Sequence, residues 1–266
     1  MPQKDVIDVA SPSIARMNNY LLGGKDHYPA DQEACERLLQ VVPGARCVAE
    51  SAHRFLLRVT SHLVREYGIR QFIVFGAGLP MAMSVHQVAR SVDVRCRVVY
   101  ADDDPLVLTH GRALWEDQRR TMVVRANPLQ VGYLLCAPPV LRLIDIHLPV
   151  AVLLVSVLHT IPDRADPAGL LEQTARVLAP GSCVAASQLV SEDADVRRQA
   201  DAVLQGAASG WWGRIRPRAE VESFFSTLRL LAPGQVDVSQ WRPGSDRAAS
   251  TGSPLWAEYG GVAQVR

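Results

Sequence analysis

The residues of this sequence whose spacing best suits ligand chemistry are a glycine turn and a run of acids. The turn Gly76-Ala77-Gly78 ends the apolar run 72–75, and the carboxylates Asp102 and Asp103 end a second apolar run, 98–101. A buried strand that ends in Gly-x-Gly lets the backbone approach a ligand, and an acid at the tip of the next strand can accept hydrogen bonds from two ribose hydroxyls. The pattern predicts the nucleotide-binding half of a parallel α/β sheet.

The third acid of that run has a simpler interpretation. Asp104 is followed by Pro105, and Asp before Pro is the usual start of a helix, with the Asp as N-cap. We therefore expect Asp104 to cap a helix rather than to contact a ligand.

A histidine follows the most strongly apolar run of the chain, 150–157. Such a run is typical of a central strand of a parallel sheet, which places His159 at the mouth of the expected site. A neutral imidazole there can serve as a general base or as a hydrogen-bond partner of a substrate. The alternative is a structural histidine that shapes the loop, and the sequence leaves both open.

Two further clusters allow both a functional and a structural interpretation. Tyr20, Lys25, Asp26 and Tyr28 flank the Gly-Gly pair at 23–24; they can close over a ligand or form a plain helix-capping loop. The pair 211–212, Trp-Trp, can wall an apolar pocket or simply belong to the core.

The elements that must position these residues alternate between helix and strand. The predicted fold class is α/β, a Rossmann-like sheet that is mostly parallel, with an antiparallel C-terminal strand pair at its edge and a helical N-terminal lid. We expect the lid to be residues 1–68 and the Rossmann-like domain to be residues 69–266, in a single structural unit. Helices are predicted over 13–22, 31–42 (capped by Asp31), 49–67, 105–118, 129–147 (with a break at Pro138-Pro139), 167–178, 193–207 and 218–230. Strands are predicted over 72–75, 98–101, 122–124, 150–157, 182–190, 236–241 and 256–264.

Composition narrows the partners. The formal net charge is +1, so nothing favours a nucleic acid or an anionic membrane, and a small-molecule substrate is the expectation. The N-terminus has no apolar signal region, and the longest apolar run, 149–158, is too short to span a bilayer. We expect a soluble cytoplasmic protein, and a homodimer is compatible with the sequence.

The chain resembles an actinobacterial family of S-adenosyl methyltransferases, once called a domain of unknown function, within the class I S-adenosylmethionine-dependent superfamily. The likeness covers essentially the whole chain, and the N-terminal Gly-Gly-Lys-Asp segment is its most diagnostic part. The motifs that carry it are Asn18-Asn19-Tyr20-Leu21-Leu22-Gly23-Gly24-Lys25-Asp26, Gly76-Ala77-Gly78-Leu79-Pro80, Asp104-Pro105-Leu106-Val107-Leu108, Leu153-Leu154-Val155-Ser156-Val157-Leu158-His159, Ser239-Gln240-Trp241-Arg242-Pro243 and Tyr259-Gly260-Gly261-Val262.

This resemblance implies S-adenosylmethionine as cofactor, S-adenosylhomocysteine as its product, and no metal. His159 and Tyr20 are the candidate catalytic residues. The candidate cofactor-binding residues are Gly76, Ala77, Gly78, Asp102, Asp103, Asn127, Pro128, Ser156, Lys25 and Asp26.

Three positions depart from the family pattern. An acid usually stands where this chain has Val74, a threonine where it has Ala77 and an aspartate where it has Asn127. The acid ordinarily engages the methionine end of the cofactor, and its loss removes a charged contact worth roughly 1.5–3 kcal/mol. The aspartate accepts a hydrogen bond from the adenine amino group, which the amide oxygen of Asn127 can still do.

The leading hypothesis is methyl transfer to a small-molecule oxygen, nitrogen or carbon nucleophile, in secondary metabolism. The altered positions also favour a second hypothesis, a repurposed pocket that catalyses a cyclisation, elimination or rearrangement. A third is a catalytically silent binding or regulatory protein. Binding of the cofactor tests the pocket, and product formation separates the first hypothesis from the others.

Overall fold

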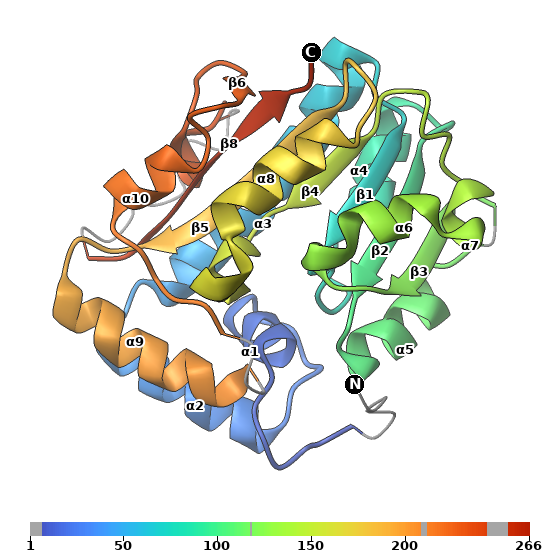
Figure 1. Cartoon of the computed structure of the whole chain (residues 1–266). Helices are drawn as coiled ribbons and strands as arrows, with labels where there is room; N and C mark the ends of the chain where they lie inside the picture. The colour runs from blue at the N-terminus through green and yellow to red at the C-terminus, as the bar shows by residue number, and fades with distance from the viewer. Residues whose placement is uncertain (1–6, 118, 209–211, 244–254) are drawn as a thin grey trace.

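A single sheet organises the chain (Figure 1). The computed structural model describes residues 7–117, 119–208, 212–243 and 255–266. Across the sheet the strand order is β3-β2-β1-β4-β5-β8-β6, and β7 also pairs with β8. β8 runs antiparallel to its partners, while β3, β2, β1, β4 and β5 are parallel to one another. The strands are β1 (Gln71–Phe75), β2 (Arg97–Asp102), β3 (Thr121–Arg125), β4 (Ala151–Leu154), β5 (Cys183–Val190), β6 (Arg229–Leu230), β7 (Val236–Asp237) and β8 (Ala257–Gln264).

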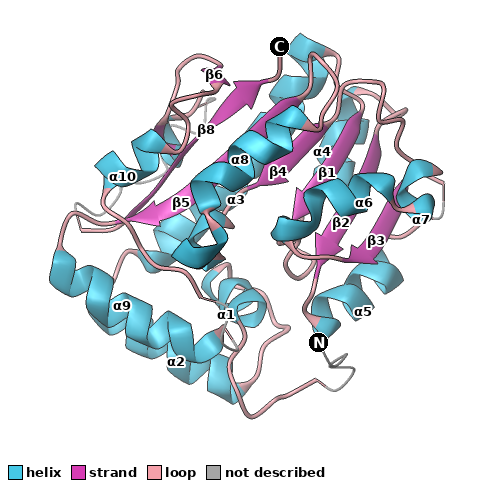
Figure 2. Ribbon diagram, viewed as in Figure 1, coloured by secondary structure: helices cyan, strands magenta, loops and turns pink. Residues whose placement is uncertain are grey.

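Helices cover both faces of the sheet, as Figure 2 shows, because each central strand is apolar on both sides. On one face pack α3 (Ala45–Tyr67), α4 (Val85–Val92) and α5 (Pro105–Leu114). On the other face pack α6 (Val131–Cys136), α7 (Pro138–Leu141), α8 (Pro167–Arg176) and α10 (Arg218–Ser223). The expected fold class, including the antiparallel C-terminal strands, is confirmed.

A second, purely helical cluster lies beyond the carboxyl ends of the strands. α1 (Ile14–Leu21) and α2 (Pro29–Val41) pack there with α9 (Ala194–Ala207), in the lower part of Figure 1. α3, by contrast, belongs to the core of the sheet through buried side chains such as Phe55 and Leu63. The helices predicted within residues 1–68 therefore lie in two places: α1 and α2 pack with α9, whereas most of α3 packs on the sheet.

Helix starts follow the side chains that cap them. Asp104 caps α5, as predicted, because its Oδ1 accepts hydrogen bonds from the N–H groups of Leu106 and Val107 at 2.8 and 3.4 Å. Asp31 is not the cap of α2. It lies in the first turn, where its carboxylate accepts from the backbone N–H of the capping residue, Tyr28, at 2.8 Å and forms a buried ion pair with Arg16.

Several predicted boundaries are wrong. The predicted helix over 129–147 breaks at Pro138 as expected, but it begins with a turn of 3-10 helix at Pro128 and ends at Leu141. The predicted helix over 218–230 ends at Ser223, and residues 229–230 pair with β8 instead. The predicted strand over 236–241 is only two residues long before a turn of 3-10 helix follows. β8 lies between β5 and β6 rather than at the sheet edge.

Candidate functional site

Two neighbouring cavities open at the carboxyl ends of the strands. The larger has a volume of about 430 Å³ and extends from the tips of β2 and β3 to the helical cluster of α1, α2 and α9. The smaller, of about 80 Å³, lies behind the glycine turn, between α1 and α3. Gly76, Gly78 and Ser156 line both. We call the part of the larger cavity that is lined by Asp102, Asp103, Asn127 and Pro128 the Asp102 end. The part that is lined by Ser156, His159, Trp212, Trp256 and Glu258 is the Glu258 end.

The glycine turn needs its glycines. Gly76 has φ +61° and Gly78 has φ +66°, a region that other residues enter at a cost. A Cβ on Gly76 would also lie 2.9 Å from Cγ2 of Val157. The turn therefore stays close to the cavity, with the backbone forming part of its wall.

Asp102 completes the Asp102 end. Its Oδ2 accepts the N–H of Gly78 at 3.1 Å, and its Oδ1 accepts the N–H of Asp104 at 3.0 Å. Each carboxylate oxygen has a second lone pair that remains for a ligand hydroxyl. Burial raises the pKa of Asp102 to about 7, because the charged form loses solvation that these two N–H groups only partly replace. Asp103, beside it, lines the same cavity but is exposed.

Asn127 and Pro128 form the rim of this end, after β3. The Asn127 Oδ1 accepts the N–H of Leu129 at 3.0 Å and thereby caps the short 3-10 helix 128–130. That cap uses one lone pair of the amide oxygen, and a second remains for a donor such as an adenine amino group.

The Glu258 end is built from two strands of the sheet, β5 and β8, and from the turn that follows β4. Glu258, on β8, is 3% exposed. Its Oε1 accepts the hydroxyl of Ser156 at 2.7 Å and that of Ser187, on β5, in a still shorter contact. Ser187 in turn accepts the backbone N–H of Ser156 at 2.8 Å, while Ser156 itself has φ 58°. This network fixes a carboxyl group in the wall of the larger cavity.

No cation balances Glu258 among the residues that the structure describes. Burial is the main cause that raises its pKa, and the two serine hydroxyls oppose that shift. Sequence reasoning missed both Glu258 and Ser187. The one available signal was an acid inside an otherwise apolar predicted strand, which is unusual for a position that must be buried.

His159 lies in the same wall, and its hydrogen bonds decide its chemistry. The N–H of Leu189 donates to Nδ1 of His159 at 3.2 Å. Burial, together with the charge of Arg216, lowers the pKa of His159 to about 3, so the ring is neutral and carries its proton on Nε2. Among the described residues none is hydrogen-bonded to Nε2. Of the two functional roles left open by the sequence, this tautomer supports hydrogen-bond donation rather than general base catalysis.

Apolar side chains enclose the remainder of the larger cavity. They come from α1, α2, α3, β5, α9 and the two flanking segments that carry Trp212 and Trp256. The sequence left open whether Trp212 walls a pocket or belongs to the core; it is buried and also lines this cavity. Trp211 lies outside the described residues. The apolar lining comprises Met17, Leu21, Leu38, Val48, Leu189, Leu204, Ala207, Trp212 and Trp256.

Three predicted site residues line neither cavity. The hydroxyl of Tyr20 donates to Glu36 at 2.6 Å, and the guanidinium of Arg46 lies over its ring. Lys25 is exposed, and the carboxylate of Asp26 lies 3.7 Å from His110. The loop folds in this way because Asn19 accepts the N–H of Asp26 at 2.9 Å. The Gly-Gly-Lys-Asp segment at 23–26 therefore forms the loop between α1 and α2 and is not part of the cavity wall.

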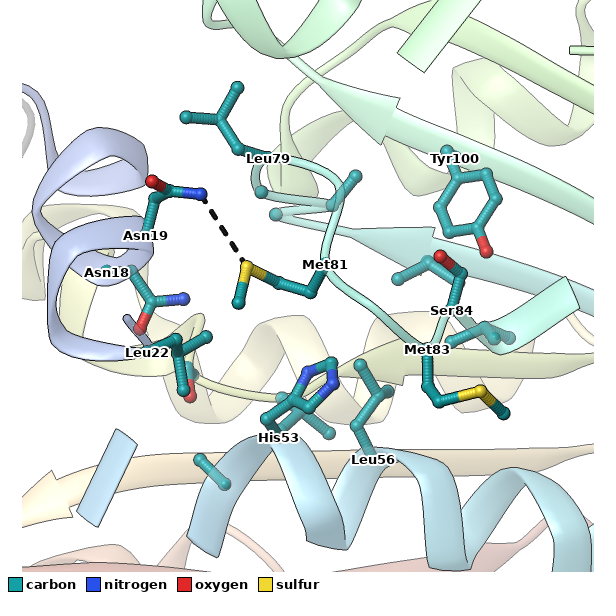
Figure 3. A pocket seen from close by; sticks show the side chains of 18 of the residues that line it. Asn18, Asn19, Leu22, His53, Leu56, Leu79, Met81, Met83, Ser84 and Tyr100 are labelled. Carbon is teal, nitrogen blue, oxygen red and sulfur yellow. Dashed lines mark hydrogen bonds between the residues drawn. The ribbon is translucent and has the colours of Figure 1, made fainter. Parts of the chain in front are cut away.

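Figure 3 shows the smaller cavity from close by. Asn19 of α1 points across it and donates to the sulfur of Met81 at 3.6 Å, while His53 approaches from α3. Val74 and Ala77, two of the three positions that depart from the family pattern, lie in its lining. An apolar side chain thus stands in the wall next to the glycine turn.

The described part of the chain contains no group of three His, Cys, Asp or Glu side chains placed to hold a metal ion. None of its helices combines the length and the apolar character needed to cross a bilayer.

The strand order, the glycine turn and the acid at the tip of β2 define the class I S-adenosylmethionine-dependent methyltransferase fold. The family model described as S-adenosyl methyltransferase matches residues 1–266, and the chain belongs to this family. None of the curated proteins compared with the sequence matches it.

Solved structures agree with this assignment. A DUF574 family protein from Streptomyces avermitilis is 34% identical, with a TM-score of 0.88 over 98% of this chain and 100% of that one. A structure from Thermobifida fusca is 33% identical, with a TM-score of 0.85 over 97% of each chain. The trans-methyltransferase CalH, solved with S-adenosylhomocysteine, shares the fold at 14% identity, with a TM-score of 0.53 over 94% of this chain and 72% of that one.

Proposed function

We propose that this protein binds S-adenosylmethionine at the Asp102 end of the larger cavity and transfers its methyl group to a small, largely apolar acceptor, such as a secondary metabolite, at the Glu258 end. The observation that carries the proposal is that one cavity contains both the nucleotide-type constellation and an apolar chamber with isolated polar groups. When bound, the cofactor would supply a methyl group already activated by its sulfonium.

The residues of the Asp102 end fit such a ligand. The free lone pairs of Asp102 suit two ribose hydroxyls, and Asn127 with Pro128 suits an adenine at the rim. The backbone of Gly76 and Gly78 lines the cavity directly, as close approach of a ligand to this turn requires. These features support the assignment residue by residue.

The lid, formed by α1 and α2, and the apolar chamber would orient the methyl donor and the acceptor relative to each other. α1 and α2 cover the cavity, and the ion pair of Arg16 with Asp31 fixes the start of α1 against α2. Transfer of a methyl group from an activated donor depends mainly on holding the two reactants close and in line. A preformed, largely apolar chamber would supply that without a general base at His159.

Isothermal titration with S-adenosylmethionine and S-adenosylhomocysteine tests the binding half of the proposal. We expect micromolar binding of both and loss of at least tenfold in affinity in Asp102→Ala, because charged hydrogen bonds to the ribose are lost. Asp195→Ala, at an exposed position of α9, is the matched control and should bind as the native protein does. A folded native protein that binds neither ligand would contradict the proposal.

One observation favours a second candidate. Val74 is 3% exposed and lines the smaller cavity where the family carries an acid, which suits a pocket that retains the fold and catalyses a non-methylating rearrangement. Mass spectrometry of the cofactor after turnover separates the two. Methyl transfer converts it to S-adenosylhomocysteine, whereas a rearrangement leaves it intact.

A further inference from the structure

The walls of the two cavities contain acids but no strong bases. Among the described residues that line either cavity, none is a lysine or an arginine. The acids in the lining are Asp102, Asp103, Asp104 and Glu258. The two histidines, His53 and His159, have a pKa that burial lowers, so they add no positive charge near neutral pH. The walls therefore favour a ligand that carries positive charge.

Glu258 is the acid of the Glu258 end among the described lining residues. It is 3% exposed, and the hydroxyls of Ser156 and Ser187 both bind its Oε1. Hydroxyls stabilise a carboxylate but do not neutralise it, and no described lysine or arginine balances this one. Burial therefore raises the pKa of Glu258 in the ligand-free protein. A ligand cation would oppose that shift, because an opposite charge at close range favours the carboxylate.

Ser156 connects Glu258 to the nucleotide part of the site. It lines both cavities together with Gly76 and Gly78, and its hydroxyl lies 2.7 Å from Oε1 of Glu258. Only β1 separates β2, which ends at Asp102, from β4, so the tips of β2 and β4 are about 10 Å apart, or two strand spacings. The amino-acid tail of a nucleoside whose ribose binds Asp102 can span that distance. An acceptor in the apolar chamber can direct an amine to the same carboxyl.

An ammonium group is the cation that suits this position. It offers three hydrogen-bond donors with a full positive charge, so it can bind Glu258 while the serine hydroxyls keep their places on Oε1. Hydrogen bonds between charged groups are roughly twice as strong as neutral ones. Trp212 and Trp256 line the same end of the cavity, and aromatic rings also attract cations.

We infer that Glu258 is the carboxylate that binds an ammonium group of a ligand in this cavity. The ammonium belongs either to the amino-acid tail of the nucleoside or to an amine acceptor. The inference rests on the proposed function, since it specifies the ligand group at the Glu258 end of the same site. Ser156 and Ser187 are positioning residues that hold the carboxyl in the wall.

The first arm of the test titrates the full chain with two nucleosides that differ only in the amino group. S-adenosylhomocysteine carries the ammonium, and its deamino analogue keeps the carboxylate but lacks the ammonium. Neither has a sulfonium, so the ammonium is the cation that the comparison isolates. If the tail supplies the group, the native protein should bind S-adenosylhomocysteine at least tenfold more tightly, because the analogue loses a charge-assisted hydrogen bond.

The second arm asks whether an acceptor supplies the amine. 2-Phenylethylammonium and 2-phenylethanol have nearly equal shapes, and each is titrated into the full chain saturated with S-adenosylhomocysteine, so that no turnover takes place. If an acceptor supplies the group, the native protein should bind the ammonium at least tenfold more tightly than the alcohol. If the tail of the nucleoside already occupies Glu258, the two probes should bind alike.

Glu258→Gln identifies the group responsible, because the amide keeps an acceptor for the serine hydroxyls and removes the charge. This variant should reduce the preference for the ammonium to less than about threefold in the arm in which the native protein shows it. Glu222→Gln is the matched control. Glu222 is exposed, hydrogen-bonds Tyr259, the next residue of β8, at 3.1 Å, and lines neither cavity. Its variant should keep the full preference.

Either of two results would overturn the inference. One is a native protein that shows no preference for the ammonium in either arm, a measurement that needs no variant. The other is a folded Glu258→Gln protein that retains the native preference. Failure of the proposed function is recognised separately: a native protein that binds neither nucleoside loses the proposed function and this inference with it. A protein that binds both nucleosides equally and does not prefer the amine loses only this inference.

Discussion

At the Asp102 end of the larger cavity, the functional groups lie at the tips of neighbouring parallel strands, and Asp102 is held by backbone N–H groups of Gly78 and Asp104. At the Glu258 end, Ser156, Ser187 and Glu258 come from segments up to 102 residues apart and are held by one another's side chains. The first arrangement follows from the fold itself. The second depends on the register of β8 against β5, so that end can vary while the fold stays the same.

The largest expected effect lies in the loop that carries His159. Arg216 is fully buried and binds the carbonyls of Leu158 and Ile161 as well as Asp163 and Glu220. Arg216→Met removes a buried donor from all four groups, of which the two acids keep another partner, Arg214. The change should destabilise the protein by about 3–5 kcal/mol. Urea unfolding measures this directly.

Arg214 provides the control, because it pairs with the same two acids, Asp163 and Glu220, but its side chain is 38% exposed. Arg214→Met should cost at most about 1 kcal/mol. Equal unfolding midpoints for the two variants would show that burial of Arg216 does not hold the Glu258 end together.

A smaller effect is expected at the Asp102 end. Gly76→Ala forces a left-handed alanine and a contact of 2.9 Å with Val157, at a cost of about 2–4 kcal/mol together. It should also weaken S-adenosylhomocysteine binding at least tenfold, as titration will show. Gly132→Ala, in α6 with nothing within 4 Å of its Cβ, should instead be neutral or slightly stabilising. A Gly76→Ala protein with native affinity would contradict the close approach of this turn to the ligand.

The contrast between the two ends explains what the sequence could predict. Strand, turn and acid are local patterns, so β1, β2, the glycine turn and the cap at Asp104 could be located without a structure. Glu258 could not, because its partners depend on a strand register that no local pattern encodes. The helix over 218–230 failed for a related reason: Phe224 and Phe225 are buried in a turn just as well as in a helix, and pairing of Leu230 with Ala263 ends the helical path. Tyr20, Lys25 and Asp26 were misplaced because their side chains turn to other partners or to the surface: Tyr20 binds Glu36, Asp26 lies near His110 and Lys25 is exposed.

The smallest expected effect is a dependence on pH at the Asp102 end. The pKa of Asp102 is about 7 in the folded protein, above its value of about 3.9 in an unfolded chain. The folded state thus binds the extra proton between these values, and stability contributed by this group falls as pH rises from about 4 to 7. Ribose hydroxyls favour the carboxylate, so binding releases a proton and S-adenosylhomocysteine should bind more weakly at pH 6 than at pH 8, by at most about tenfold.

Titration calorimetry in two buffers of different ionisation enthalpy measures that proton release. Asp102→Asn should abolish it, because the amide does not titrate. The same pH dependence in both proteins would assign it to another group and separate Asp102 from the ligand.

The most direct test of the shared cavity is a crystal structure of the protein with S-adenosylhomocysteine. We expect the ribose hydroxyls to bind Asp102, the adenine to lie beside Asn127 and Pro128, and the sulfur to point toward Ser156 and Glu258. The chamber around Trp212 and Trp256 should remain available for an acceptor. A nucleoside that instead fills that chamber, or binds away from Asp102, would contradict it.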